Sequence, residues 1–129
     1  MRGPSGADRI VCVGDVANDI VVVPDGAIRD DTDTPARIRR LAGGSAANTA
    51  AWLGRAGVPV DLVGCVGAAD AGLHEELLRR SGVTPRLHVV QDAETTTIVV
   101  VVEGEHRSML TDRGASRMLR QDMVGDALL

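Results

Sequence analysis

Short apolar runs alternate with helix-like stretches through the first two thirds of the chain. Three runs rich in Val and Ile predict strands, over Ile10–Gly14, Ile20–Val23 and Val60–Val66. Small and apolar residues over Ala46–Ala56 and Ala71–Ser81 predict two helices, which Gly57 and Gly82 close because glycine readily takes the C′ position. Strand, helix, strand and helix in this order predict a parallel α/β sheet with flanking helices.

The pattern changes after Gly82. Three short strand-like runs follow, over Arg86–Val90, Thr95–Glu103 and Arg107–Thr111. A tight turn at Gly104 joins the last two, and together the runs predict a small antiparallel sheet added to the α/β layer. Because Thr95–Val102 is almost wholly β-branched, we expect a lid, a partner subunit or a missing segment to cover its edge. Gln121–Leu129 begins a further helix-like pattern.

The remaining segments predict connections. Residues 1–8 are polar and contain Gly, Pro and Ser, so we expect a disordered tail. Asp15–Asp19 predicts a turn between the first two strands, and the Asp-rich Pro24–Pro35 predicts a solvated loop. Ala36–Ala42 predicts an extended segment that leads into a double glycine.

Composition narrows the range of partners. The chain has 129 residues, 44% of them hydrophobic and 25% charged, which fits one soluble globular domain. Trp52 is its one aromatic residue, which argues against base-stacking surfaces for single-stranded nucleic acid. Every basic residue is Arg, and a Walker A loop is excluded because it needs Lys. With a net charge of −4, the short cluster Arg37–Arg40 predicts a solvated strand face, and we expect no nucleic-acid partner.

Neither cysteine nor histidine follows a metal-ligand spacing. Cys12 and Cys65 each lie among valines near the end of an apolar run and predict buried core thiols. Three scattered histidines, His74, His88 and His106, predict no metal site. The amino-terminal pattern matches no signal peptide or membrane span, so we expect no membrane partner and a cytoplasmic location.

The stretch from Gly43 to Asn48 predicts a small-ligand site. Gly43 and Gly44 let the backbone approach a bound molecule, and Ser45 suits the N-cap of the following helix. The N–H groups at that helix end favour an oxygen-rich or anionic ligand. Asn48, in the first turn, can donate to and accept from a hydroxyl group. The alternative is an ordinary tight turn from strand to helix.

Four segments in sequence order resemble the amino-terminal half of the ribokinase-like, or PfkB-type, carbohydrate kinases. The second of them, with Gly54-Arg55-Ala56-Gly57 downstream, resembles the first signature of that family. The segments are Val13-Gly14-Asp15-Val16-Ala17-Asn18-Asp19, Gly43-Gly44-Ser45-Ala46-Ala47-Asn48-Thr49-Ala50, Gly64-Cys65-Val66-Gly67-Ala68-Ala69-Asp70-Ala71-Gly72 and Asp112-Arg113-Gly114-Ala115-Ser116.

The resemblance implies a ribokinase-like α/β fold with a β lid, built from strands over about 15–42 and 86–111. Asp19 matches the carboxylate that accepts hydrogen bonds from two sugar hydroxyls in such kinases, and a turn-capping Asp is the alternative. The substrate-binding residues that it implies are Asp19, Gly43, Gly44 and Asn48, with Arg113 and Gly114 in a loop near the same pocket or in an ordinary turn. A lid of this kind excludes water and often pairs two subunits as a homodimer.

By the same resemblance, the ATP site, Mg²⁺ and the catalytic aspartate belong to a carboxy-terminal half that residues 9–129 do not include. Asp70 is instead predicted to cap the second helix. We therefore expect no catalytic residue in this chain and no phosphate transfer by it alone, as in a truncated kinase. The alternative is a non-catalytic sugar-binding or dimerisation module; a Rossmann reading is weaker, because Gly14 lacks two partner glycines. The sequence leaves the sugar unassigned, and the lack of aromatic residues in the lid disfavours a nucleoside.

Overall fold

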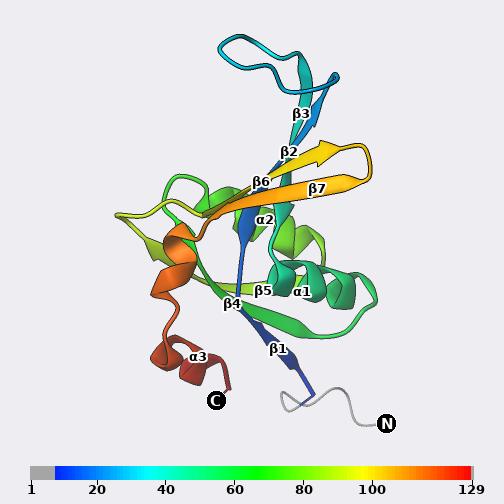
Figure 1. Cartoon of the computed structure of the whole chain (residues 1–129). Coiled ribbons are helices and arrows are strands. Elements are labelled where there is room, and N and C mark those ends of the chain that lie inside the picture. The colour runs from blue at the N-terminus through cyan, green and yellow to red at the C-terminus, as the bar shows by residue number, and fades with distance from the viewer. Residues whose placement is uncertain (1–7, 129) are drawn as a thin grey trace.

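Two sheets form the framework of the computed structural model, which describes residues 8–128 (Figure 1). The predicted disordered tail, residues 1–8, lies outside the described residues except for Asp8. A three-stranded parallel sheet with its helices forms the lower body, and a four-stranded sheet rises from it (Figure 1). The mixed α/β class predicted from the sequence is confirmed.

The parallel sheet of the body has the strand order β1-β4-β5. Alternate residues of its central strand β4 face helices α1 and α2. Leu62 is one of them and is fully buried among side chains of both helices. The opposite face is covered by α3, where Cys65 contacts Met123 at 3.8 Å between sulfurs. The body elements are β1 (Ile10–Val13), α1 (Ser45–Arg55), β4 (Val60–Gly67), α2 (Ala71–Arg80), β5 (Val83–Val90), the short 3₁₀ helix η1 (Gly114–Met118) and α3 (Gln121–Leu128).

The second sheet, which we call the lid sheet, has the strand order β3-β2-β6-β7. Its outer pairs are antiparallel, but β2 and β6 at its centre run parallel. The hairpin of β2 and β3 extends beyond the other strands as a projecting arm (Figure 1). The four strands are β2 (Ala17–Pro24), β3 (Ala36–Gly43), β6 (Thr96–Glu103) and β7 (His106–Asp112).

Strand pairing corrects three expectations. Arg86–Val90 belongs to β5, which pairs in parallel with β4, so the lid does not begin at residue 86. The predicted turn Asp15–Asp19 is wrong beyond Val16, because Ala17 already begins β2. The β-branched strand β6 has partners on both sides, β2 and β7, so its edges are covered within the chain.

The N-terminal cap of α1 differs from the prediction, whereas the C-terminal ends of α1 and α2 agree with it. Gly44, and not Ser45, holds the N-cap position of α1, and no side chain caps that helix. Gly57 and Gly82 have φ of +83° and +82°, as expected for glycines that end helices in the left-handed region. None of the helices among residues 8–128 is long and apolar enough to cross a membrane.

A buried carboxylate ties together the three strands of the body. Asp61 on β4 accepts hydrogen bonds from Arg9 Nε at 2.9 Å, next to β1, and from Arg86 Nε on β5 at 2.6 Å. Burial raises the pKa of Asp61, but the hydrogen bonds from Arg86 and Arg9 outweigh it and hold the pKa below its usual value. The ionised form therefore stabilises the folded sheet.

Asp61→Asn should lower the free energy of unfolding by about 2 kcal/mol, because two charge-assisted hydrogen bonds lose their ionised acceptor. Urea denaturation at pH 7 measures the change. The matched control is Asp92→Asn on the exposed surface, which should change the free energy by less than about 0.5 kcal/mol. Equal effects of the two substitutions would contradict a role for Asp61 in holding the strands together.

Candidate functional site

Asp19 lies on β2 with its carboxylate over the backbone of Gly43. The two strands pair Ala17 with Gly43 and Asp19 with Leu41, so Asp19 and Gly43 share one face of the lid sheet. A Cβ atom added to Gly43 would overlap the Asp19 carboxylate, which shows that the glycine makes room for it. The predicted substrate-binding residues Asp19 and Gly43 are therefore in contact distance at the base of the lid sheet.

The Asp19 carboxylate has an unfilled hydrogen-bonding capacity. Its Oδ1 atom is buried and has no hydrogen-bond partner among the described residues. Burial raises the pKa of Asp19. A buried acceptor of this kind costs free energy unless a donor reaches it, and a ligand hydroxyl is such a donor.

Gly44 lets the chain turn sharply from β3 into α1. Its φ is +101°, a conformation that residues with a side chain rarely adopt. A Cβ atom there would also overlap the backbone carbonyl oxygen of Asp15. The same carbonyl accepts a hydrogen bond from the Ala47 N–H at 3.3 Å, so the double glycine brings the start of α1 against the loop that follows β1.

Asn48 lies in the first turn of α1, where its backbone N–H donates to the Gly44 carbonyl at 2.9 Å and its side chain is exposed. Asn48 and Gly43 line a common pocket of about 170 Å³ between α1 and α2. Polar side chains of Arg55 and His74 also line it, but Asp19 does not. The structure therefore brings Asn48 together with Gly43, and Gly43 together with Asp19.

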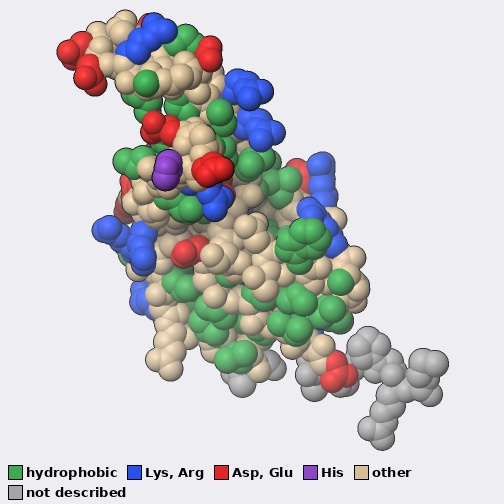
Figure 2. Space-filling model, turned by 45° about the vertical axis from the view of Figure 1, so that its right-hand side comes forward, with side chains coloured by type: hydrophobic (Ala, Val, Ile, Leu, Met, Phe, Trp, Pro, Cys, Tyr) green, Lys and Arg blue, Asp and Glu red, His purple; other side chains and the backbone are tan. Residues whose placement is uncertain are grey.

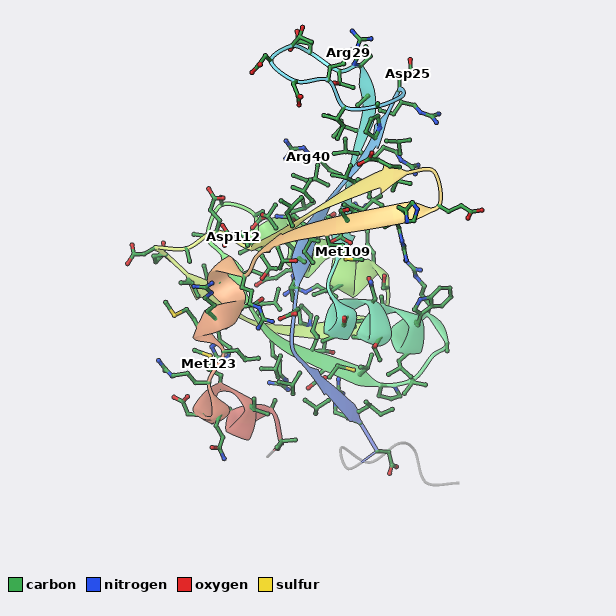
Figure 3. All side chains as sticks on the ribbon, viewed as in Figure 1. Asp25, Arg29, Arg40, Met109, Asp112 and Met123 are labelled. Atoms are coloured by element: carbon green, nitrogen blue, oxygen red, sulfur yellow. The ribbon has the colours of Figure 1, made fainter. Side chains whose placement is uncertain are left out.

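Arg113 and Gly114 lie where β7 leads into η1, next to Asp112 (Figure 3). The Arg113 carbonyl accepts a hydrogen bond from Thr96 Oγ1 at 2.6 Å, and Thr96 pairs with Ala17. Since Ala17 in turn pairs with Gly43, this loop sits at the same end of the lid sheet as the double glycine. Arg113 accepts this hydrogen bond, and Gly114 donates one to Asp112 Oδ1, through backbone groups; neither bond joins them to Asp19.

Sequence reasoning missed a hydrogen-bonded cluster that joins the lid sheet to the body. Asn18 Nδ2 donates to Asp70 Oδ2 at 2.6 Å, and Asn18 Oδ1 lies 2.8 Å from His74 Nε2. Thr95 Oγ1 donates to the other oxygen of Asp70 at 2.5 Å. Because Asn18 Oδ1 is an acceptor, His74 Nε2 carries the proton.

The predicted capping role of Asp70 is confirmed for its position only. Asp70 holds the N-cap position of α2, but its side chain makes no capping hydrogen bond and binds Asn18 and Thr95 instead. Burial raises the pKa of Asp70, yet the hydrogen bonds from Thr95 and Asn18 hold it below its usual value. Burial lowers the pKa of His74, and the nearby Asp70 opposes that shift only in part.

One signal in the sequence points to this cluster. Asn18 and Asp19 are adjacent, so in a strand they must face opposite sides of the sheet. Because Asp15–Asp19 is predicted to be a turn, the prediction does not include the alternation of Asn18 and Asp19 between the two sides of a strand. His74 also lies four residues after Asp70, which places both on one side of α2.

Metal ligands do not group among the described residues. No three His, Cys, Asp or Glu side chains within residues 8–128 are arranged to hold a metal ion. Cys65 is buried and Cys12 half-buried, and burial raises the pKa of both thiols, which keeps them protonated.

Comparison with protein families settles the relationship. The family model of pfkB family carbohydrate kinases matches residues 7–128. The chain belongs to this family. No curated protein matches this pfkB-family chain.

Solved structures of three kinases resemble this pfkB-family chain. Fructokinase with bound ATP from Xylella fastidiosa is 25% identical, with a TM-score of 0.75 over 94% of this chain and 38% of that one. Ribokinase from Cryptococcus neoformans var. grubii serotype A, in complex with ADP, is 27% identical, with a TM-score of 0.70 over 84% and 35%. A nucleoside kinase from Methanocaldococcus jannaschii is 25% identical, with a TM-score of 0.76 over 85% and 38%. The ribokinase-like fold is thereby confirmed, and the chain spans less than half the length of these kinases.

His74→Gln should flatten the pH dependence of stability in this pfkB-family chain. Because burial lowers the pKa of His74, the unfolded state binds the proton more readily, and stability falls as pH drops below about 6.5. Glutamine keeps an N–H donor for Asn18 but does not titrate. Chemical unfolding from pH 7.5 to pH 5 measures the slope, with His106→Gln at the exposed start of β7 as control. An unchanged slope in His74→Gln would show that another group is responsible.

Proposed function

We propose that this chain is the sugar-binding portion of an ATP-dependent carbohydrate kinase that phosphorylates a sugar hydroxyl. One observation carries the proposal: the Asp19 carboxylate lies over Gly43 with a buried oxygen that has no partner among the described residues. An ionised carboxylate accepts strong, oriented hydrogen bonds from a pair of hydroxyls. Family membership supports the assignment to carbohydrates.

The neighbouring residues supply the rest of the subsite. Gly43 leaves the space that a side chain would fill, and the exposed Asn48 amide offers both a donor and an acceptor to a hydroxyl. Gly44 turns the chain from β3 into α1, and the loop of Arg113 and Gly114 lies at the same end of the lid sheet through the hydrogen bond of Thr96 to the Arg113 carbonyl. The lid sheet above them excludes water from the sugar.

ATP and Mg²⁺ belong to the proposed activity of the whole protein. Two of the similar kinases carry ATP or ADP, which supports a nucleotide as phosphate donor. The described residues do not group into a metal site, so no step of phosphate transfer is assigned to them. The alternative is a non-catalytic sugar-binding module, which shares the same subsite. A cytoplasmic location stays a prediction.

Asp19→Asn should weaken sugar binding by about 10-fold or more, because two charge-assisted hydrogen bonds become neutral ones. Gly43→Ala should also weaken it, because the added Cβ displaces the Asp19 carboxylate. Isothermal titration of the 129-residue chain with ketohexoses, aldohexoses and pentoses measures the affinity.

Two matched controls accompany these variants. Asp25→Asn removes a carboxylate at the far end of the same hairpin (Figure 3), and Gly72→Ala adds a Cβ where no atom lies within 4 Å. Both should bind sugar as the parent does. Equal affinity for Asp19→Asn and the parent would overturn the subsite. ATP consumption in the same samples tests the expectation that the chain alone transfers no phosphate.

We also propose that a second copy of the chain packs against the lid-sheet face opposite Asp19. On that face Ile38 of β3 and Leu110 of β7 are each 61% exposed, with β2 and β6 between them. Burial of exposed aliphatic side chains of this kind favours association. The arrangement would leave the Asp19 face free for the sugar.

Leu110→Asn should shift the chain from dimer to monomer, because an amide replaces an aliphatic side chain in the proposed contact. Light scattering coupled to size-exclusion chromatography measures the molar mass over a concentration series. Met109→Asn is the matched control, since Met109 is equally exposed but faces the other side of the lid sheet. A monomeric parent chain, or equal effects of both variants, would overturn this interface.

A further inference from the structure

Three arginines share the face of the lid sheet on which Asp19 lies: Arg37 and Arg39 on β3, and Arg107 on the outer strand β7, where it pairs with Val102. Arg39 pairs with Val21, which stands two residues beyond Asp19 on β2. Because side chains two residues apart in a strand point to the same side, Arg39 and Asp19 lie on one face. Arg37, two residues further along β3, lies on that face too, whereas Arg40 lies on the opposite one.

The surface hollows confirm this division of the arginines. Five residues line a hollow of about 500 Å³. Four of them lie on the Asp19 face, namely Val21, Val23, Arg37 and Arg39, and the fifth is Ile38. Arg40 instead lines a separate hollow with Asn18, Ile20 and residues of α2. In Figure 2, basic side chains lie on the flank of the projecting arm, below the acidic groups at its tip.

The two β3 arginines on the Asp19 face have no anionic partner among the described residues. Among residues 8–128, Arg37 and Arg39 take part in no ion pair, in contrast to Arg9, Arg86 and Arg120. Both are exposed, and their immediate neighbours on β2 are valines. A guanidinium beside an apolar hollow is suited to a carboxylate or phosphate, which it binds through two parallel N–H donors.

The distance from Asp19 to Arg39 suits one small ligand. Two residues along a strand and one strand across separate the two Cα atoms by about 8 Å. An arginine side chain can bridge part of that separation, so its guanidinium reaches an anionic group attached to a sugar whose hydroxyls bind Asp19. Arg37 is one further step from Asp19 and adds positive potential rather than direct contact.

We propose that the substrate is a sugar that carries an anionic group, a phosphate or a carboxylate, and that Arg39 binds this group while Asp19 binds the sugar hydroxyls. The inference rests on the proposed function and adds the substrate class to it. Arg39 is thus a specificity-determining residue, and the valines beside it limit the competition of water for the guanidinium.

The test compares neutral and anionic sugars on the 129-residue chain by isothermal titration. The probes are fructose against fructose 6-phosphate, glucose against gluconate, and inorganic phosphate alone. We expect at least one anionic sugar to bind about 10-fold or more tightly than its neutral counterpart, with the preference falling as salt is added. Inorganic phosphate should bind more weakly than the sugar phosphate, because it makes no contact with Asp19.

The decisive variants are Arg39→Gln and Arg40→Gln, which make the same change at adjacent exposed positions on opposite faces. Arg39→Gln should abolish the preference for the anionic sugar and leave the affinity for the neutral sugar unchanged. Arg39→Lys should restore part of the preference, since it keeps the charge but not the paired donors. Arg40→Gln should leave both affinities as in the parent chain.

Each contrary outcome has a distinct meaning. Binding of neutral sugars with no preference for anionic ones overturns this inference and leaves the proposed function standing. No binding of any sugar overturns both. Inorganic phosphate that binds as tightly as fructose 6-phosphate, without loss in Asp19→Asn, overturns the shared site. Weakened self-association in Arg39→Gln with unchanged sugar preference would assign the arginines to an acidic loop of a second copy instead.

Discussion

The hydrogen bonds of Asn18 to Asp70 and His74 hold the lid sheet to the α/β body. They join the first turn of α2 to the start of β2. Thr95, next to the start of β6, donates a further hydrogen bond to the Asp70 carboxylate. Buried polar groups that are satisfied in this way fix one relative arrangement of the elements that they join. The base of the lid sheet is therefore a fixed point, from which the projecting arm extends (Figure 1).

Strand β2 separates two neighbouring polar side chains to opposite sides of the lid sheet. Asn18 faces α2 and makes internal hydrogen bonds, whereas Asp19 faces the other side with a carboxylate oxygen that has no partner among the described residues. The same alternation on β3 separates Arg39 from Arg40. The register between β2 and β3 thus decides which carboxylate and which guanidinium share one face of the lid sheet.

Glycines at the junction of the sheets allow these contacts. Gly43 leaves room for the Asp19 carboxylate, and Gly44 takes a positive φ that brings α1 against the loop after β1. A side chain at either position would push the sheet and the helix apart. The close backbone approach at this junction therefore depends on the absence of a side chain at both positions, and the small-ligand site predicted from the double glycine stays a prediction.

The sequence by itself determined the α/β alternation, both helices, the glycines that end them and the pfkB-family resemblance, because these depend on periodicity and on residues close together in the chain. From the sequence alone, Arg86–Val90 is assigned to the lid instead of the parallel sheet, and Asp70 is assigned only a capping role. Whether a β-rich run joins a parallel or an antiparallel neighbour depends on partners far along the chain, here β4. The cluster around Asn18 and the shared face of Asp19 and Arg39 likewise needed the tertiary structure, since strand register and long-range hydrogen bonds leave no local pattern.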